Sequence, residues 1–241
     1  MQDLKDVLWE ERNRTEVGEY AERGAVVVVP IGSLEQHGVA LPVSTDSRDL
    51  TFVAHRGAQL AEGVPVLVTP VIPFGVSPHH MMYGGTISLR VETVVALLTD
   101  ICESIVADGF DRILILNGHG GNSNTIGAAA LQLKHHLKRQ IEALTWWDLI
   151  PEVIDAVREG PCRTIGHAGE SECSCILALT PDAVRKDQLR LVEGISDDPS
   201  LGTAAKGRRI LEAAAEALAH KLRAMAALPG RQIQGIERVR A

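Results

Sequence analysis

Three short stretches of the sequence contain acidic and imidazole side chains of the kind that bind metal ions. In the first, Glu35 and His37 are followed by Asp46, nine residues beyond His37. Side chains at positions i and i+2 of an extended segment point to the same side, so Glu35 and His37 are expected to face one site. A loop is expected to return Asp46 to it. Carboxylate and imidazole form a ligand set for Zn²⁺, Mn²⁺ or Fe²⁺, and an ordinary polar surface loop is the alternative interpretation.

The second stretch is the glycine-rich sequence NGHGGN, residues 117–122, directly after the apolar run RILIL. Glycines around His119 allow a tight turn from strand to helix and a close approach to a ligand. A phosphate-binding loop is the alternative, but the spacing G-x-G-x-x-G and the sequence G-K-[ST] are both absent. A histidine on such a turn is better explained as a metal ligand.

The third stretch is HAGESECS, residues 167–174, at the start of a predicted helix. Glu170 and Glu172 are two positions apart, so they diverge by about 200° on a helix and at most one is expected to face the site. His167 precedes the helix and is a candidate ligand or general acid/base. Stabilisation of the positive end of the helix dipole is the alternative role for both glutamates.

Apolar runs and helical patterns alternate along the chain, which predicts an α/β fold with a mostly parallel sheet covered by helices on both faces. We expect a single domain over residues 1–241, because no linker or change of composition divides the chain. Ligands of such sheets bind at the carboxyl ends of the strands, where two of the three polar stretches fall. Strands are predicted at residues 25–31, 64–72, 112–117 and 141–147, and helices at 50–63, 91–109, 123–139, 169–179 and 203–227.

The composition excludes several classes of protein. The formal charge of −7, with no basic cluster to offset it, argues against a nucleic-acid partner. No apolar run reaches the ~18 residues of a membrane span, and the charged N-terminal stretch is unlike a signal peptide. Four cysteines without a C-x-x-C pair predict buried free thiols in a reducing compartment. We therefore expect a cytoplasmic protein with neither nucleic acid nor membrane as a partner.

Together, the three stretches resemble the creatininase (creatinine amidohydrolase) family, with matching residues PIGSLEQHGVALPVSTD at 30–46, NGHGGN at 117–122 and HAGESECS at 167–174. The resemblance implies a three-layer α/β/α domain and a hydrolase with two divalent ions, Zn²⁺ and/or Mn²⁺, with Fe²⁺ as a further option. It implies that Glu35 and His119 bind one metal and His37 the other, with Asp46 bridging them. His167 would be the catalytic proton donor.

The glycine turn departs from creatininase itself. The family's second metal site is completed there by a glutamate two residues after the turn histidine, and this chain has Gly121 at that position. The resemblance to relatives with the Gly-Gly turn implies Glu172 as the replacement ligand, with Glu170 as the alternative. Gly120 stands where creatininase carries an aromatic substrate contact, which argues against creatinine as the substrate. Ser77, His79 and Gly120 are the expected substrate contacts.

The expected activity is hydrolysis of an amide or cyclic amide C–N bond in a small molecule. Family relatives that share the site offer three alternatives: a peptidase for the mycofactocin precursor, a formamide (pyrimidine) deformylase, and a hydrolase of a cyclic keto-sugar. A non-catalytic domain that binds a small molecule is a further alternative. The family also implies a homo-oligomer, commonly a hexamer.

Overall fold

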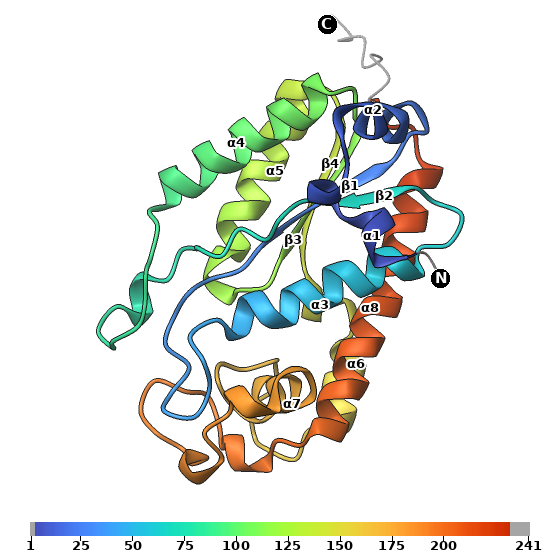
Figure 1. The fold of residues 1–241 in the computed structure, drawn as a ribbon. Helices are drawn as coiled ribbons and strands as arrows, with labels where there is room; N and C mark the ends of the chain where they lie inside the picture. Colours follow the sequence, from blue (N-terminus) through green and yellow to red (C-terminus); the bar gives the residue numbers. More distant parts are fainter. Residues whose placement is uncertain (1–2, 232–241) are drawn as a thin grey trace, which may run out of the picture.

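The computed structural model describes residues 3–231 and has a four-stranded sheet at its centre (Figure 1). The strand order is β2-β1-β3-β4 and all three pairings are parallel. The strands are β1 (Val26–Ile31), β2 (Val66–Val68), β3 (Arg112–Asn117) and β4 (Gln140–Thr145). The predicted parallel sheet is confirmed. Strand β2 is shorter than predicted, because the expected range 64–72 includes Pro65 and Pro70, which lack the N–H that a ladder requires.

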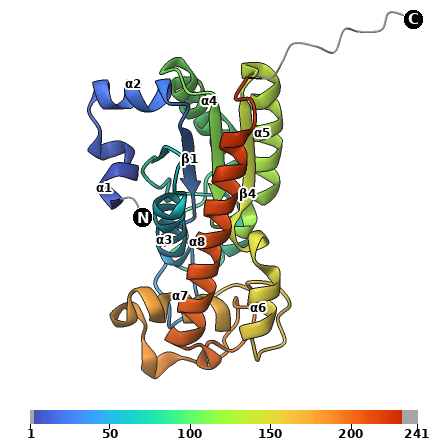
Figure 2. The ribbon, with the colours of Figure 1, turned by 90° about the vertical axis from the view of Figure 1, so that its right-hand side faces the viewer.

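Helices cover both faces of the sheet and form three layers (Figures 1 and 2). On one face, α3 (Thr45–Leu60) and α8 (Ala204–Ala227) pack with Val26 and Val28 of β1. On the other, α4 (Val91–Ala107) and α5 (Ser123–Leu137) pack with Val27 and Val29. Successive residues of β1 therefore point into two separate cores, which explains why the whole strand is apolar.

Helix α7 (Glu170–Leu179) packs against α8 below the sheet in Figure 1. Three further helices were not predicted: α1 (Leu4–Val7), α2 (Arg14–Glu22) and α6 (Pro151–Val157). Helix α2 fully buries none of its residues, and its apolar stripe of Val17, Tyr20 and Ala21, partly buried against the core, is too short to stand out among the charged residues around it. A capping box between Asn13 and Glu16 marks its start instead.

Two predicted boundaries near the polar stretches are wrong. Helix α3 begins at Thr45, before the expected residue 50, so Asp46 lies in its first turn and not on a loop. Strand β4 ends at Thr145, and Trp146–Leu149 form a 3₁₀ turn. The other 3₁₀ turns are Trp9–Glu11, Pro78–His80, Gly120–Asn122, Pro181–Ala183, Lys186–Gln188 and Pro199–Leu201.

Within residues 3–231, no helix combines the length and the apolar character that crossing a membrane requires. The predicted domain of residues 1–241 also includes residues 1–2 and 232–241, which lie outside the described part of the chain.

Candidate active site

The polar stretches converge beyond the carboxyl ends of β1 and β3. Glu35 and His37 lie on the segment that follows β1, and His119 lies two residues after β3. The first turns of α3 and α7 supply Asp46 and Glu172. All five side chains belong to residues that are at most 5% exposed. Burial of so many ionisable groups is costly unless they are paired or coordinate a cation.

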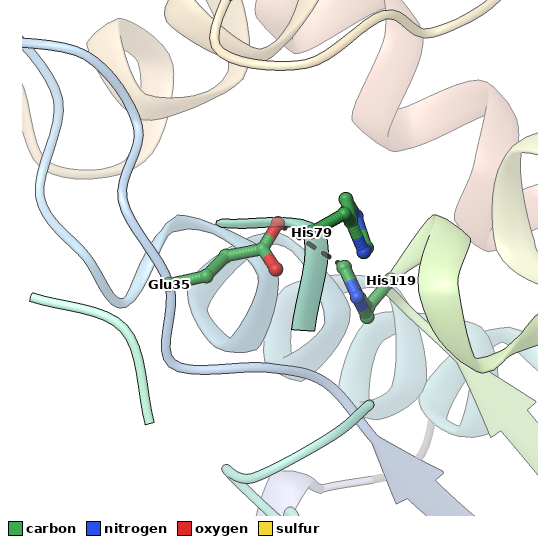
Figure 3. A group of neighbouring side chains, drawn as sticks. All are labelled: Glu35, His79 and His119. Carbon is green, nitrogen blue, oxygen red and sulfur yellow. Dashed lines mark ion pairs between the residues drawn. The ribbon is translucent and has the colours of Figure 1, made fainter. Parts of the chain in front are cut away.

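One group is formed around His119 (Figure 3). Its Nδ1 lies 3.2 Å from Oε1 of Glu35 and 3.2 Å from Oδ2 of Asp46. Its Nε2 lies 3.1 Å from the main-chain oxygen of Val76 and 3.0 Å from the hydroxyl of Ser77. A proton donated by Nε2 to the Val76 carbonyl leaves the lone pair of Nδ1 directed at the carboxylates, which is the orientation of a metal-binding imidazole.

The second group is formed around His37 in the same way. Its Nδ1 lies 3.1 Å from the main-chain oxygen of Glu35. Its Nε2 lies 3.1 Å from Oδ1 of Asp46 and 3.4 Å from Oε2 of Glu172. The two carboxylate oxygens of Asp46 thus face different histidines, an arrangement suited to a carboxylate shared between two cations.

Three buried atoms of this cluster have ion-pair contacts but no hydrogen bond among the described residues: Oε1 of Glu35, Nε2 of His37 and Oδ2 of Asp46. Buried polar atoms without a hydrogen bond are rare, and a bound ion is one explanation for them. Candidate ligand atoms of Glu35, His79 and His119 lie within 4.8 Å of one another, and so do those of His37, Asp46 and Glu172. The donor set therefore fits divalent metal ions, with nitrogen and oxygen donors suited to Zn²⁺ or Mn²⁺.

The titration behaviour of the metal-free cluster points the same way. Burial alone would lower the pKa of His119, but Asp46 and Glu35 outweigh it and raise that pKa to about 10. Burial would also lower the pKa of His37, but Asp46 and Glu172 outweigh burial and raise that pKa well above its ordinary value. Burial would raise the pKa of Glu35 and of Asp46, but His119 and Ser77 lower the pKa of Glu35, and His37 and His119 lower that of Asp46. Protonated imidazoles thus supply the positive charge that this cluster of carboxylates requires.

His167 lies beside both groups, with Nδ1 at 3.4 Å from Oε1 of Glu35 and its ring 4.4 Å from that of His37. Burial and the neighbouring charge of His37 lower the pKa of His167 to about 4. Sequence reasoning missed Gln36, whose Nε2 lies 2.9 Å from Nε2 of His167; its position next to Glu35 was the available signal. It considered His80, together with His79, only as a substrate contact, and the ring of His80 stacks on that of His167 at 4.1 Å.

Of the three predicted substrate contacts, two line the pocket and one does not. His79 and Gly120 line the pocket above the cluster, and His79 is exposed. Ser77 is fully buried, and its hydroxyl lies 2.6 Å from that of Ser33 as well as against His119. Ser77 is therefore in place to orient the imidazole and is absent from the pocket lining.

The two glutamates of α7 diverge as their spacing predicts. Glu172 faces His37, whereas Glu170 contacts Lys206 and belongs to none of the ligand groups. Burial would raise the pKa of Glu170, but Lys206 and the N–H groups of Gly160 and Glu159 outweigh it and lower that pKa. Of the two alternatives, only Glu172 is positioned near the cluster.

The glycine turn has a steric explanation. A Cβ atom on Gly121 would lie 2.2 Å from the main-chain oxygen of Val76 and 2.5 Å from Nε2 of His119. A Cβ atom on Gly120 would meet nothing within 4 Å. Gly121 is therefore required by the close approach of the Val76 segment, and a glutamate at that position is incompatible with this backbone.

The pocket has a volume of about 320 Å³. Among the described residues its lining contains no Lys or Arg. A larger groove of about 710 Å³ runs beside α3 but contains no member of the ligand groups. The pocket lined by the cluster is therefore the candidate active site. Its lining residues are Glu35, Asp46, His79, His80, His119, Gly120, Gly121, Ser123, Trp147, Asp148, Thr164, Ile165, Gly166, His167 and Glu172.

Known proteins resemble this chain over most of its length. A model of the creatinine amidohydrolase family matches residues 10–222. The mycofactocin precursor peptide peptidase of Mycobacterium tuberculosis is 32% identical over 219 residues, covering 78% of this chain and 80% of the relative. The creatinine amidohydrolase of Pseudomonas putida is 32% identical, covering 68% of each chain.

Solved structures agree with the sequence relatives. A crystal structure of creatinine amidohydrolase superposes with a TM-score of 0.80 at 25% identity, covering 90% of this chain and 97% of that one. A manganese form of creatininase gives a TM-score of 0.78 at 26% identity, covering 91% of this chain and 98% of that one. These matches confirm the predicted α/β fold and the resemblance. The chain belongs to the creatininase family of hydrolases.

Proposed function

We propose that the protein hydrolyses an amide or cyclic amide C–N bond at a site that binds two divalent metal ions. The observation that carries this proposal is the position of Asp46, whose two carboxylate oxygens lie against different histidines. Glu35 and His119 would hold one ion and His37 and Glu172 the other, with Asp46 shared. Bound ions of this kind polarise a carbonyl group and lower the pKa of water.

The chain's own residues perform the proton transfers. His167 has a lowered pKa of about 4, so its imidazole is neutral near pH 7 and able to accept a proton from the attacking water. The same imidazole then donates that proton to the leaving nitrogen, which avoids the expulsion of an amine anion. The amide N–H of Gln36 donates to Nε2 of the neutral ring and orients it, and this contact would be released when Nε2 takes up the proton. His167 would therefore be the catalytic acid/base.

Zn²⁺ and Mn²⁺ are the proposed ions. The imidazole and carboxylate donors suit both, and the related solved structures include a manganese form of creatininase and a Zn-Zn form of a creatininase mutant. No Lys or Arg lies in the described lining of the pocket, so a bound cation is the available source of positive charge for a developing oxyanion.

A peptide-like amide is the substrate class that we favour. The relatives that match most of this chain include the mycofactocin precursor peptide peptidases. In addition, Gly120 leaves open space on the glycine turn for a larger substrate. His79 and Gly120 line the pocket and would contact the substrate. Creatinine serves as the cyclic amide against which hydrolysis of peptides is compared.

Metal removal tests the proposal. Protein stripped with a chelator and then reloaded with Zn²⁺ or Mn²⁺ should be assayed against creatinine and a panel of short peptides. We expect activity to disappear on stripping and to return with metal, because the proposed chemistry needs the ions. Full hydrolytic activity of the metal-free protein would contradict the mechanism, and metal binding without any turnover would favour a non-catalytic binding domain.

We also propose a homo-oligomer, with the hexamer that the resemblance implies as the expected form. Met81 and Met82 are 60% and 78% exposed on the loop that carries His79, and a neighbouring subunit would cover this apolar surface. A monomer by light scattering would contradict this proposal.

We propose a cytoplasmic location as well. The four free cysteines support it, because thiols stay reduced in that compartment.

A further inference from the structure

We infer that Glu170 is a positioning residue whose carboxylate holds the wall segment, residues 159–168, against the pocket. Four residues of this segment line the pocket: Thr164, Ile165, Gly166 and His167. The inference rests on the proposed function in one respect, since His167 is the proposed acid/base. Glu170 touches no member of the ligand groups and acts through the position of the segment.

The wall segment contains neither helix nor strand, so no regular ladder of main-chain hydrogen bonds sets its course. Its buried or half-buried main-chain groups then need partners outside a regular ladder, and side chains supply several of them. At its first end, Oε2 of Glu170 accepts hydrogen bonds from the N–H groups of Gly160 at 2.7 Å and Glu159 at 3.0 Å. One carboxylate thus fixes the entry to the segment.

The opposite end is held by other residues. Oε2 of Glu172 accepts the N–H of Ala168 at 2.5 Å, and Ser196 exchanges two hydrogen bonds of 2.8 Å with the main chain of His167. Ala168 adopts a positive φ of 54°, which is uncommon for a residue with a side chain. Because Glu170 and Glu172 diverge on α7, they hold opposite ends of the segment from one helical turn.

Lys206 provides the charge that stabilises the buried Glu170 carboxylate. Its ammonium group contacts Oε1 of Glu170 at 2.5 Å and Oε1 of Glu159 at 2.7 Å. Glu170 is 1% exposed, and a buried carboxylate needs such a partner. Lys206 lies in the first turn of α8, so the contact connects the wall segment to the longest helix of the fold.

The hydrogen-bonding pattern makes the substitution Glu170→Gln a sharp test. The hydrogen-bond partners of the carboxylate among the described residues are all donors: two main-chain N–H groups and one ammonium group. A carboxamide of the same shape would place its NH₂ group against one of these donors, whichever way it is turned. The substitution therefore loses the negative charge and either the main-chain hydrogen bonds or the contact with Lys206, while it preserves the volume of the side chain.

The ion pair between Lys221 and Glu142 offers a matched control. Lys221 also lies on α8, and its ammonium group contacts Oε2 of Glu142, on β4, at 2.5 Å. Neither residue lines the pocket. The variants Glu142→Gln and Lys221→Met thus remove a pair of the same chemistry, on the same helix, without touching the wall segment.

The experiment measures amide hydrogen exchange in the full-length protein loaded with Zn²⁺, together with its zinc content. Loss of charge-assisted hydrogen bonds at Glu170 should accelerate exchange over residues 159–168 by about tenfold or more. Glu170→Gln and Lys206→Met should both show this local change with zinc content unaltered, and Lys206→Arg should restore slow exchange. The Glu142→Gln and Lys221→Met proteins should exchange in this segment as the unmodified protein does.

A second measurement compares the rates at which each protein hydrolyses 4-nitroacetanilide and 4-nitrophenyl acetate. The anilide requires protonation of its leaving nitrogen and the activated ester does not, so displacement of His167 should lower the anilide-to-ester rate ratio in Glu170→Gln.

Unchanged exchange in the wall segment would overturn the inference, as would acceleration spread evenly over the whole chain, since that would show a general loss of stability. If the unmodified protein hydrolyses neither compound, the proposed function fails, and hydrogen exchange still decides whether Glu170 holds the segment.

Discussion

Oδ1 of Asp46 lies 3.1 Å from Nε2 of His37, and both residues are almost fully buried. This contact arises because α3 begins at Thr45, so that its first turn points Asp46 back at the segment that follows β1. An acidic residue is favourable at that position, since the positive end of the helix dipole offsets its charge. The other oxygen of the same carboxylate faces His119 at 3.2 Å.

Asp46→Asn should lower the affinity for divalent metal by more than about 100-fold, because it removes the charge shared by both ions. Asp49→Asn is the matched control. Asp49 is also buried on α3. Burial, together with the nearby Glu172 and Asp46, raises the pKa of Asp49 well above its ordinary value. The neutral amide of Asn therefore replaces a side chain that already favours its neutral, protonated form. Metal analysis after dialysis measures both variants. Full metal content in Asp46→Asn would contradict the assignment.

The metal-free protein should lose stability as pH rises from about 6.5 to about 10. The folded pKa of His119 is raised from 6.5 to about 10, so the folded state binds this proton more tightly than the unfolded state does. The stabilisation is fully present below pH 6.5 and disappears as pH rises through the folded pKa, and it is on the order of a few kcal/mol.

Urea denaturation of chelator-treated protein across that range measures this effect. The decline should be smaller in His119→Asn, and it should vanish when Zn²⁺ is added, because a metal-bound imidazole stays neutral. A free energy of unfolding that rises with pH in the metal-free protein would refute the assigned pairing.

Gly121→Ala should destabilise the protein by about 1–3 kcal/mol, since its Cβ would collide with the main-chain oxygen of Val76. Gly120→Ala is the neighbouring control and should change the free energy of unfolding by less than about 0.5 kcal/mol, because its Cβ meets open space. Chemical denaturation compares the two. Equal effects of the two substitutions would show that the close approach at Gly121 is absent in solution.

His167→Gln should reduce hydrolysis of an anilide by about 100-fold or more and leave hydrolysis of an activated ester much less affected, because a good leaving group needs no proton. Metal content should be unchanged. Loss of metal in this variant would instead make His167 a ligand, consistent with the short distances among Glu35, His37 and His167.

The local sequence determined the strands and the identity of the candidate ligands. Strand β3 occupies residues 112–117 as predicted, since an unbroken apolar run between glycine-rich turns has few alternatives to a buried strand. Glu35, His37 and His119 could be named because carboxylate and imidazole groups followed such strands, whereas Glu172 was chosen over Glu170 only through the family resemblance. The parallel order of the strands follows from their alternation with helices.

Only the tertiary structure decided which side chains meet. The start of α3 escaped sequence analysis because Thr45 to Asp49 lack apolar periodicity, whereas in the structure this first turn packs closely on Gly32 and Gly118, which follow β1 and β3. The separate roles of Glu170 and Glu172 depend on Lys206, which lies 36 residues from Glu170 along the chain. Local patterns report the backbone conformation, whereas contacts between residues distant in sequence depend on how the helices pack on the sheet.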